Sequence, residues 1–399
     1  MTASVLFYVQ HLLGIGHLQR ILRIAEALAR DGIAVTLVSG GAPVALPRDP
    51  AIGFVQLTPV RALDARFELV DSAGRPIDDS LREGRRAALL AAFATARPDA
   101  VIIEGFPFAR RAFRFELEPL IAAVRAATPR PRLICSVRDI VVVRDDPQRH
   151  REIVLRVRRD FDAVLVHGDP ALIALDASFP AAPDIADRLI YTGYVYASAD
   201  SAGAAPVTAG DEVVVSAGGG AAGHALLAAA LAARRSGCLA GLSWRLIAGT
   251  NLPEAQFAAL GADLPAGVAV ERFCYNFVGL LRGCRVSVSQ AGYNTVLDIL
   301  AAHARAVLVP FAAGRETEQL MRAERLAALG AAELVRENEL SPQSLAAAIE
   351  RAASREPATV AIDTGGAAGT ARLIAAMICP GECRAEGFVT GASKGIIGQ

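Results

Sequence analysis

Short apolar runs alternate with amphipathic helices along the first half of the chain, in the pattern of a parallel α/β sheet. Residues 5–9 form a continuous apolar run, and residues 18–30 carry apolar side chains at the spacing of one helix face. A buried parallel strand gives such a run because helices cover both of its faces. Residues 43–84 show neither period and predict exposed loops. The strands predicted by this pattern are residues 5–9, 33–38, 99–104, 132–140 and 163–166.

The same order of elements begins again after residue 210. Residues 212–216 are an apolar strand, residues 217–223 a glycine-rich loop, and an Ala/Leu helix continues to residue 233. The two halves therefore predict two domains of similar architecture. The expected segments are a first domain at residues 1–196, a linker at 197–210, a second domain at 211–360, a last helix at 361–378 and a flexible tail at 379–399.

Composition narrows the class of protein. The chain has 399 residues, 53% of them hydrophobic, which is enough to fill two cores. Lys plus Arg and Asp plus Glu both number 41, so no overall basic charge favours nucleic acid as a partner. The six cysteines form no C-x-x-C pair, which argues against a zinc site or a disulfide framework and predicts a cytoplasmic location. No apolar run is long enough to span a bilayer, and peripheral contact with the inner face of a membrane stays open.

Residues 286–300, with the sequence VSVSQAGYNTVLDIL, predict a buried strand, a tight glycine turn and the start of an apolar helix. The first N–H groups of a helix are unpaired and lie at the positive end of its dipole. A phosphate can therefore bind against Asn294 and Thr295, while Gly292 allows a close approach. Asp298, one turn later, can accept hydrogen bonds from the two hydroxyls of a ribose. The same residues are also ordinary capping residues, so the pattern alone leaves both interpretations open.

Residues 290–298, with the sequence QAGYNTVLD, resemble the motif with which two-domain nucleotide-sugar glycosyltransferases bind the diphosphate and ribose of their donor. They are also similar to the corresponding stretch of the lipid-linked N-acetylglucosaminyltransferases of peptidoglycan synthesis, which have a glycosyltransferase family 28 C-terminal domain. The resemblance runs in register over residues 271–319 and places Ser289 and Gln290 beside the phosphates. Gln290 stands where relatives have histidine, so its contact would be that of a neutral amide. Glu318 and Gln319 match the acidic–Gln pair that touches the donor sugar.

The resemblance also implies the fold and further contacts. It implies the GT-B fold, an α/β fold of two Rossmann-like domains facing across a cleft, with the helix at residues 361–378 crossing back to the first domain. It implies that Gly218, Gly219 and Gly220 border the diphosphate, with Gly220 where the lipid-linked relatives have serine. Phe273 falls close to the position where the family packs an aromatic ring against the donor base.

The first-domain loop at residues 14–18, with the sequence GIGHL, carries His17. Gly14 and Gly16 lack the third glycine of the dinucleotide fingerprint, which disfavours an NAD enzyme. The loop resembles the first loop of the same glycosyltransferases, in which the histidine faces the cleft and removes the proton of the acceptor. The resemblance also places Gly14 and Gly16 among the residues that bind the nucleotide sugar. By residue type alone, a histidine at a helix start is more often a cap or a solvated side chain.

Polar residues also end two predicted strands of the first domain. Glu104 ends one of them and resembles the acidic residue that orients the base histidine; a structural pairing with Arg110 or Arg138 is the alternative. Arg138 and Asp139 end another strand, where they either face the cleft or brace the loop as an ion pair. The D-x-D pattern at residues 160–162 precedes a strand and is interpreted as a turn, so no metal site is expected.

We therefore expect a metal-independent, inverting glycosyltransferase of the hexosyltransferase class. His17 would be the base, Glu104 would orient it, and the donor would be a nucleotide sugar, UDP-linked in the first instance. No further cofactor is expected. The acceptor would be a small molecule or a lipid-linked glycan. A nucleotide-sugar hydrolase or non-hydrolysing epimerase on the same fold is the alternative, followed by a non-catalytic nucleotide-sugar-binding protein.

Overall fold

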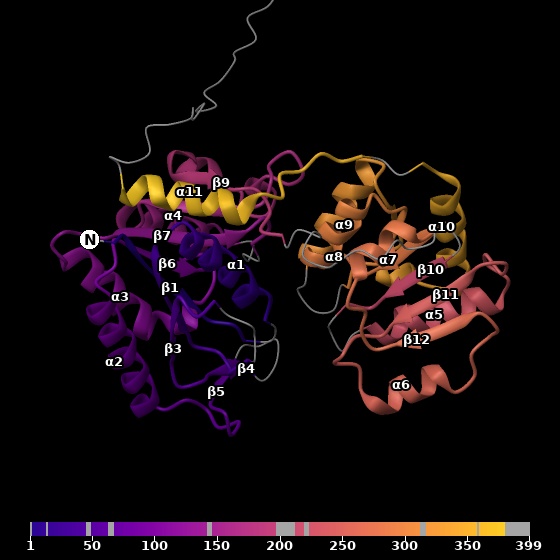
Figure 1. Ribbon diagram of the computed structural model, residues 1–399, viewed down its shortest axis with the longest axis horizontal. Helices are drawn as coiled ribbons and strands as arrows, with labels where there is room; N and C mark the ends of the chain where they lie inside the picture. The colour runs from indigo at the N-terminus through magenta and orange to yellow at the C-terminus, as the bar shows by residue number, and fades with distance from the viewer. Residues whose placement is uncertain are drawn as a thin grey trace, which may run out of the picture.

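The computed structural model describes residues 2–12, 15–44, 49–62, 68–141, 146–196, 212–218, 223–311, 317–356 and 359–379. The chain forms two parallel sheets, one in each of two bodies that lie side by side (Figure 1). The linker predicted at residues 197–210 lies outside the described residues, as does the predicted tail beyond Cys379.

The first sheet has seven parallel strands in the order β3-β2-β1-β6-β7-β8-β9. Its strands are β1 Ser4–Val9, β2 Ala34–Ser39, β3 Ile52–Gln56, β6 Ala100–Glu104, β7 Arg132–Arg138, β8 Ala163–His167 and β9 Leu189–Tyr191. The prediction that residues 43–84 are only loops was wrong, because β3 joins the sheet edge beside β2. In this edge strand only Ile52 is buried and the later positions are partly or fully exposed, so it lacks the fully buried apolar run of a central strand. A separate hairpin pairs β4 (Arg61–Ala62) with β5 (Leu69–Val70).

Helices cover both faces of the first sheet. Alternate side chains of β1 face opposite sides: Leu6 and Tyr8 pack with α2, α3 and α4, whereas Val5, Phe7 and Val9 pack with α1. The helices are α1 Gly16–Arg30, α2 Asp79–Ala96, α3 Arg114–Ala126 and α4 Pro147–Asp160, with short 3-10 turns η1 Arg111–Phe113, η2 Leu175–Ala177 and η3 Ala182–Arg188.

Local features fix where α2 and α3 begin. The side chain of Asp78 accepts a hydrogen bond from the N–H of Leu81 and so fixes the start of α2. Before α3, Arg110 has a left-handed backbone conformation, with φ of 61°, and a helix cannot continue through it.

The second sheet has six parallel strands in the order β12-β11-β10-β13-β14-β15. The strands are β10 Glu212–Ser216, β11 Ser243–Ile247, β12 Val268–Glu271, β13 Val286–Ser289, β14 Ala306–Leu308 and β15 Glu333–Leu334. Its helices are α5 His224–Arg235, α6 Glu254–Gly261, α7 Phe277–Gly283, α8 Tyr293–Ala302, α9 Glu318–Ala328 and α10 Pro342–Ser354, with a 3-10 turn η6 at Glu337–Glu339.

One face of the second sheet contributes to the contact between the domains. Helices α5, α6 and α10 pack on one side with Val213 and Val215, and α7, α8 and α9 pack on the other with Val214. The latter cluster also contains Ile140 and Leu172 from the loops after β7 and β8. Apolar packing therefore continues from the second domain into the carboxyl edge of the first sheet.

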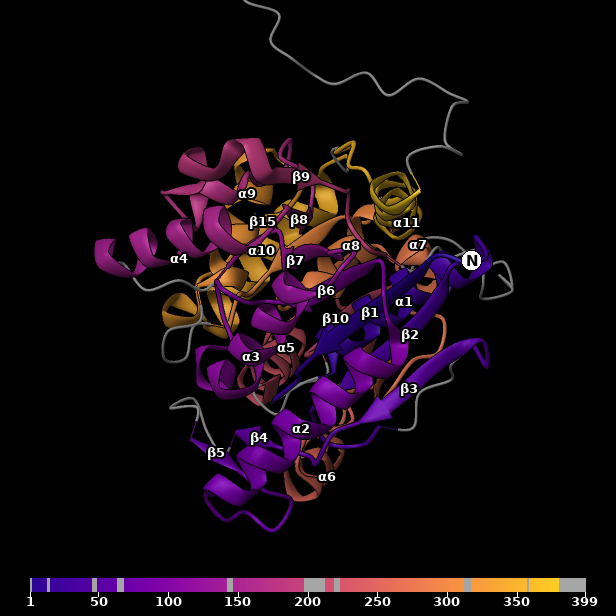
Figure 2. The same cartoon turned by 90° about the vertical axis from the view of Figure 1, so that its left-hand side faces the viewer.

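The last helix, α11 (Gly366–Ile378), lies on the first domain against α1 (Figure 1, Figure 2). Between α10 and α11 the chain returns beside the segment that leaves β9. The N–H of Tyr194 donates to the carbonyl of Asp363 over 2.7 Å, and the N–H of Gly366 donates to that of Tyr194 over 3.1 Å. A Cβ on Gly366 would lie 2.4 Å from the Gly193 carbonyl oxygen, so this crossing requires a residue without a side chain.

Both sheets reverse their winding beside their first strand. In the first sheet the chain goes from β1 outward through β2 to β3, then starts again with β6 on the other side of β1. In the second sheet the same reversal lies between β10 and β13. Open α/β sheets bind ligands beyond the carboxyl ends of the strands at this switch point. We therefore expect ligands to bind at the loops after β1, β6, β10 and β13.

Candidate functional site

The switch point of the first sheet brings His17 and Glu104 together. Glu104 is the last residue of β6, and His17 is the second residue of α1, which follows the loop after β1. The Nδ1 atom of His17 lies 2.7 Å from Oε1 of Glu104. A carboxylate in this position accepts the proton of Nδ1, so the lone pair of the ring is on Nε2. The pair has the arrangement of a base and the group that orients it.

Two arginines surround the carboxylate of Glu104. Its side chain is 1% exposed, Arg20 Nη2 lies 2.5 Å from its Oε1, and Arg110 Nη2 lies 3.7 Å from its Oε2. Burial alone would raise the pKa of Glu104, but the hydrogen bond with His17 and the charges of Arg20 and Arg110 outweigh it and lower that pKa. Both the predicted contact with His17 and the structural contact with Arg110 are therefore present.

His17 is neutral at physiological pH. Burial lowers its pKa to about 3; Glu104 opposes this shift, whereas Arg138 and Arg20 add to it. A neutral imidazole with a free lone pair is the form that a general base requires. Arg20, three residues along α1, also lies 3.2 Å from Nδ1 of His17.

Arg138 reaches from the first domain to the second. It is the last residue of β7, and its Nη1 donates to Oε2 of Glu318 over 2.8 Å. Its Nη2 lies 2.5 Å from Nε2 of His17. The predicted base and the residue predicted to hold the donor sugar are thus joined by one guanidinium group.

Asp139 does not face the cleft and does not pair with Arg138. Its side chain is fully buried and accepts two hydrogen bonds of 3.2 Å from Arg322 of α9. The alternative of an ion pair between Arg138 and Asp139 is therefore wrong, because Arg138 pairs with Glu318 and Asp139 with Arg322, both in the second domain.

The switch point of the second sheet brings the two predicted donor loops together. Ser216 and Ser289 end β10 and β13 and stand opposite each other in register. Gly218 has φ of +66°, and a Cβ there would lie 3.8 Å from Oε1 of Gln290, so the two loops are neighbours. The side chain of Ser289 is fully buried, and its contact with a donor stays a prediction. Gly219 and Gly220 lie outside the described residues.

Helix α8 starts as the donor motif requires. Gly292 is its N-cap, with extended backbone angles, and no side chain among the described residues caps the helix. Asn294 is exposed and Thr295 half-buried in its first turn. Uncapped N–H groups at the positive end of a helix are a binding position for an anion.

Asp298, one turn further, lies next to the first domain. Its carboxylate accepts a hydrogen bond of 2.8 Å from the hydroxyl of Tyr196. Burial raises the pKa of Asp298 to about 6, against the effect of this hydrogen bond. A ribose at Asp298 would therefore share or replace the contact with Tyr196.

The remaining predicted residues are Gln319, Phe273, Gly16 and Gly14. Gln319 accepts the N–H of Phe311 at 3.1 Å, which holds the end of the β14 loop on α9. Phe273 is 55% exposed and makes an edge contact with the ring of Tyr275, which is 96% exposed. Gly16 is the first residue of α1, while Gly14 lies outside the described residues.

Three residues of the site were not predicted: Arg20, Tyr196 and Arg322. Each makes its contact across a large separation in sequence, 84 residues for Arg20 with Glu104 and 183 for Arg322 with Asp139. Charged residues within helices look like ordinary solvated positions in sequence. Only Tyr196, placed at the domain boundary, carried a signal that pointed to an interdomain role.

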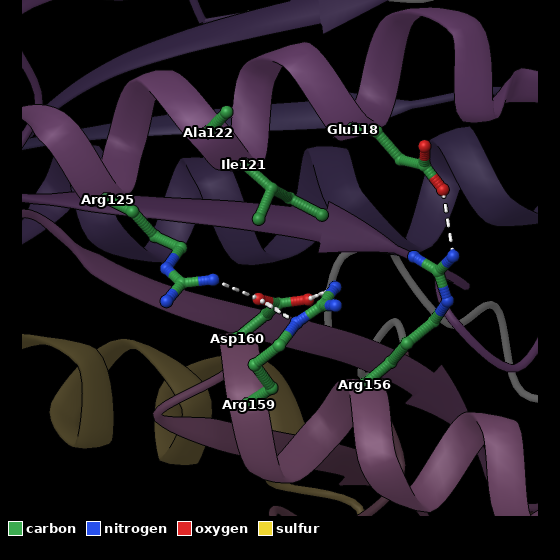
Figure 3. Close-up of a pocket in the computed structure, with 7 residues that line it drawn as sticks. All are labelled: Glu118, Ile121, Ala122, Arg125, Arg156, Arg159 and Asp160. Carbon is green, nitrogen blue, oxygen red and sulfur yellow. Dashed lines mark hydrogen bonds and ion pairs between the residues drawn. The ribbon is translucent and has the colours of Figure 1, made fainter.

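One cavity of the first domain lies away from this site. It has a volume of about 330 Å³ and lies between α3 and α4, and in Figure 3 Arg125 and Arg159 approach Asp160 from two sides. Asp160 accepts hydrogen bonds of 3.0 Å from Arg125 and 2.7 Å from Arg159. Its oxygens are satisfied by side chains of the fold, so we assign this group to joining the ends of α3 and α4. These contacts also agree with the interpretation of residues 160–162 as a turn.

Metal ligands and membrane-spanning helices are considered for the described part of the chain. Among these residues, no group of three or more His, Cys, Asp or Glu side chains is arranged to hold a metal ion. None of the helices in the described ranges has the length and apolar character needed to cross a membrane.

Comparison with known proteins finds a family match in the second domain. Residues 217–375 match the glycosyltransferase family 28 C-terminal domain. The UDP-N-acetylglucosamine–N-acetylmuramyl-(pentapeptide) pyrophosphoryl-undecaprenol N-acetylglucosamine transferase of Brucella anthropi is 36% identical over 95 residues, which are 24% of this chain and 22% of that enzyme. The enzyme of the same name from Phenylobacterium zucineum is 33% identical over 101 residues, 25% of this chain and 28% of that enzyme. The chain thus matches about a quarter of the length of these relatives.

Solved structures match over nearly the whole chain. The calicheamicin glycosyltransferase CalG4 superposes with a TM-score of 0.59 and 18% identity, covering 95% of this chain and 94% of that one. MurG of Acinetobacter baumannii gives 0.57 and 18%, covering 93% and 99%. At these identities the likeness establishes the fold. The chain therefore has the GT-B fold of these glycosyltransferases, and the family match lies within its second domain.

Proposed function

We propose that this protein transfers a sugar from a nucleotide-sugar donor to an acceptor hydroxyl. The observation that carries the proposal is the hydrogen-bonded pair of His17 and Glu104, whose Nε2 side is joined through Arg138 to Glu318 of the second domain. The first domain, residues 1–196, holds the acceptor, and the second, residues 211–360, holds the donor.

The second domain binds the donor through its switch-point loops. The diphosphate lies at the uncapped start of α8, against Gly292, Asn294 and Thr295, with Gly218 and Gln290 beside it. Asp298 accepts the ribose hydroxyls. Phe273 packs against the base, and Glu318 with Gln319 binds the sugar. The names of the Brucella and Phenylobacterium relatives specify UDP-N-acetylglucosamine, which makes a UDP-sugar the first candidate donor.

The reaction is a single displacement with inversion. Nε2 of His17 removes the proton from the acceptor hydroxyl, and the acceptor oxygen forms a bond to the anomeric carbon. The bond from that carbon to the diphosphate oxygen breaks, and the diphosphate leaves with the electron pair. Glu104 stabilises the imidazolium that forms, and the N–H groups of α8 stabilise the departing charge without a metal ion. We expect activity to survive treatment with EDTA.

The names of related proteins point to two kinds of acceptor. The relatives' names describe a lipid-linked acceptor, and CalG4 is named for calicheamicin, a small molecule. We propose an acceptor of one of these two kinds and a cytoplasmic protein that can touch the inner face of the membrane.

A turnover screen tests the function directly. Purified protein is incubated with UDP-, dTDP- and GDP-sugars, with and without acceptors from cell extract, and release of the nucleoside diphosphate is measured. We expect acceptor-dependent release that His17→Ala abolishes. His303→Asn, which alters a histidine with φ of 51° at the far end of α8, serves as the matched control and keeps its activity. Acceptor-independent release would instead identify a nucleotide-sugar hydrolase, and absence of binding to every nucleotide sugar would refute the proposal.

A further inference from the structure

The guanidinium group of Arg138 contacts His17 and Glu318 at the same time. Its Nη2 lies 2.5 Å from Nε2 of His17, and its Nη1 donates to Oε2 of Glu318 over 2.8 Å. The side chains of Arg138 and His17 are each 23% exposed, and that of Glu318 is 16% exposed, so this bridge borders solvent. It links residues 121 and 180 positions apart in sequence.

This bridge is incompatible with proton transfer at His17. Nδ1 of the ring is already bonded to Glu104, so Nε2 is the nitrogen left to accept the proton of an acceptor hydroxyl. A guanidinium group does not lose its proton in proteins, and it donates to Nε2 here. The hydroxyl cannot reach the lone pair until Arg138 moves away.

The other end of the bridge suggests what moves it. Glu318 is the carboxylate that anchors Arg138, and a sugar hydroxyl that donates to the same carboxylate competes with the guanidinium for it. The neighbouring pair of Asp139 and Arg322 is different, because its side chains are 0% and 2% exposed and doubly hydrogen-bonded. That pair can hold the domains together while the contact of Arg138 opens beside it.

We propose that Arg138 is a positioning residue that couples the two halves of the site: it occupies His17 and Glu318 together while the donor site is empty, and it releases His17 when a donor sugar binds Glu318. This inference rests on the proposed function, since it needs a nucleotide-sugar donor. Its benefit is chemical, because a base that is free only when the sugar is in place does not act on an empty site.

Linkage makes the coupling measurable in binding. If Arg138 competes with the sugar for Glu318, its removal must strengthen binding of the sugar moiety and leave the nucleotide moiety unaffected. We compare UDP-N-acetylglucosamine with UDP by calorimetry. In Arg138→Ala, the ratio of the Kd for UDP to the Kd for UDP-N-acetylglucosamine should rise about two- to fivefold over wild type, as expected for loss of a partly exposed ion pair. Arg138→Gln, which keeps the length of the side chain, should act in the same direction.

Arg325→Ala is the matched control. Arg325 lies on α9, the helix that carries Glu318, and like Arg138 it makes a contact between the domains: its Nε donates to the carbonyl of Leu172 over 2.7 Å. Its removal should leave the ratio unchanged. A fall in the ratio for Arg138→Ala, or an equal change in Arg325→Ala, would overturn the coupling.

The ring of His17 gives a second readout that needs no donor. Its charged neighbours are Glu104, Arg20 and Arg138. Arg138→Ala removes one of the two positive charges that lower the pKa of His17. We label histidine rings with carbon-13 and identify His17 by the signal missing in His17→Gln. In the wild-type protein without ligand, His17 should stay neutral at pH 5.5. In ligand-free Arg138→Ala the pKa of His17 should be higher than in the wild type. In the wild type, UDP-N-acetylglucosamine should raise the pKa of His17, whereas UDP should not. An unchanged titration in ligand-free Arg138→Ala would overturn the proposal. If neither nucleotide binds the wild type, the choice of a UDP donor fails, and the ligand-free titration still decides the role of Arg138.

Discussion

The carboxylate of Asp139 and the guanidinium of Arg322 join the two domains by two hydrogen bonds of 3.2 Å in a site closed to solvent. Arg322 also donates to the carbonyl of Ala291 over 2.9 Å, and the hydroxyl of Tyr194 donates to Asp139 over 3.3 Å. The pair therefore connects the end of β7, the donor loop and the interdomain crossing.

Loss of one partner from this pair should be costly. We expect Arg322→Met to lower the free energy of unfolding by about 3–5 kcal/mol, because it leaves the buried charge of Asp139 without its partner. Urea denaturation measures the change. The control is Glu324→Gln, which removes the exposed pair of Glu324 with Arg336 on the same helix and should cost no more than about 0.5 kcal/mol. Equal effects of the two variants would contradict a structural role for the buried pair.

Glu104→Gln should separate orientation of the base from binding of the donor. The amide can donate to Nδ1 of His17, which would move the ring proton to Nε2 and remove the base. We expect kcat to fall by about 10²–10³-fold and the Kd for the nucleotide sugar to stay unchanged. Circular dichroism checks that the variant is folded, since Arg20 and Arg110 lose their charged partner. A kcat near that of the wild type in a folded variant would exclude Glu104 from catalysis.

Donor affinity should depend on pH through Asp298. Burial raises the pKa of this carboxyl to about 6, so it is ionised above that pH and becomes protonated as the pH falls through it. The ionised form accepts both ribose hydroxyls, and we expect the Kd for a UDP-sugar to increase below pH 6. A nucleotide sugar is the right probe because it has no terminal phosphate that titrates in this range.

The matching variant is Asp298→Asn. It should weaken binding at pH 8 by about tenfold, the effect of one charge-assisted hydrogen bond, and it should flatten the pH dependence. Wild-type affinity and an unchanged pH profile in Asp298→Asn would show that the ribose does not bind there.

His167 should make the fold sensitive to acid. It is fully buried between Ser136 and Thr192, at 2.9 and 2.8 Å, and burial lowers its pKa to about 3. The unfolded chain, with its ordinary pKa of about 6.5, binds the proton that the folded chain excludes. Stability is therefore highest above pH 6.5 and falls by about 2 kcal/mol between pH 6.5 and 5 because of this group.

Urea denaturation of the wild type and His167→Gln at pH 7.5 and 5 tests this. The quantity compared is the difference in the free energy of unfolding between the two pH values, which a uniform loss of stability in the variant does not change. That difference should be smaller in the variant by about 2 kcal/mol. An equal difference in both proteins would show that His167 does not cause the acid sensitivity.

Much of the fold followed from local patterns. The central strands are continuous apolar runs, and each helix face repeats at helical spacing, so β1, β6 and β7 could be predicted from their own residues. The edge strand β3 could not, because its exposed positions resemble those of a loop and only its pairing with β2 makes it a strand.

The candidate site divides in the same way. The motif around α8 is contiguous, so its residues could be listed from the sequence. The approach of His17 to Glu104 depends on the order of strands in the sheet, which places the ends of β1 and β6 side by side. The contacts of Arg138 and Asp139 with α9 depend on how two domains pack, and nothing local to these residues indicates which arginine each carboxylate receives.

The position of α11 also affects the order in which the protein can be completed during synthesis. Ala371 and Ile374 fill part of the core that α1 shares with the first sheet, yet they are among the last described residues to leave the ribosome. Until then, the apolar surface of α1 beneath them has no cover, although the first domain was translated long before. A nascent chain that stops after the second domain would therefore carry an unfinished first domain. Loss of α11 would expose apolar side chains of α1, near the start of the sequence.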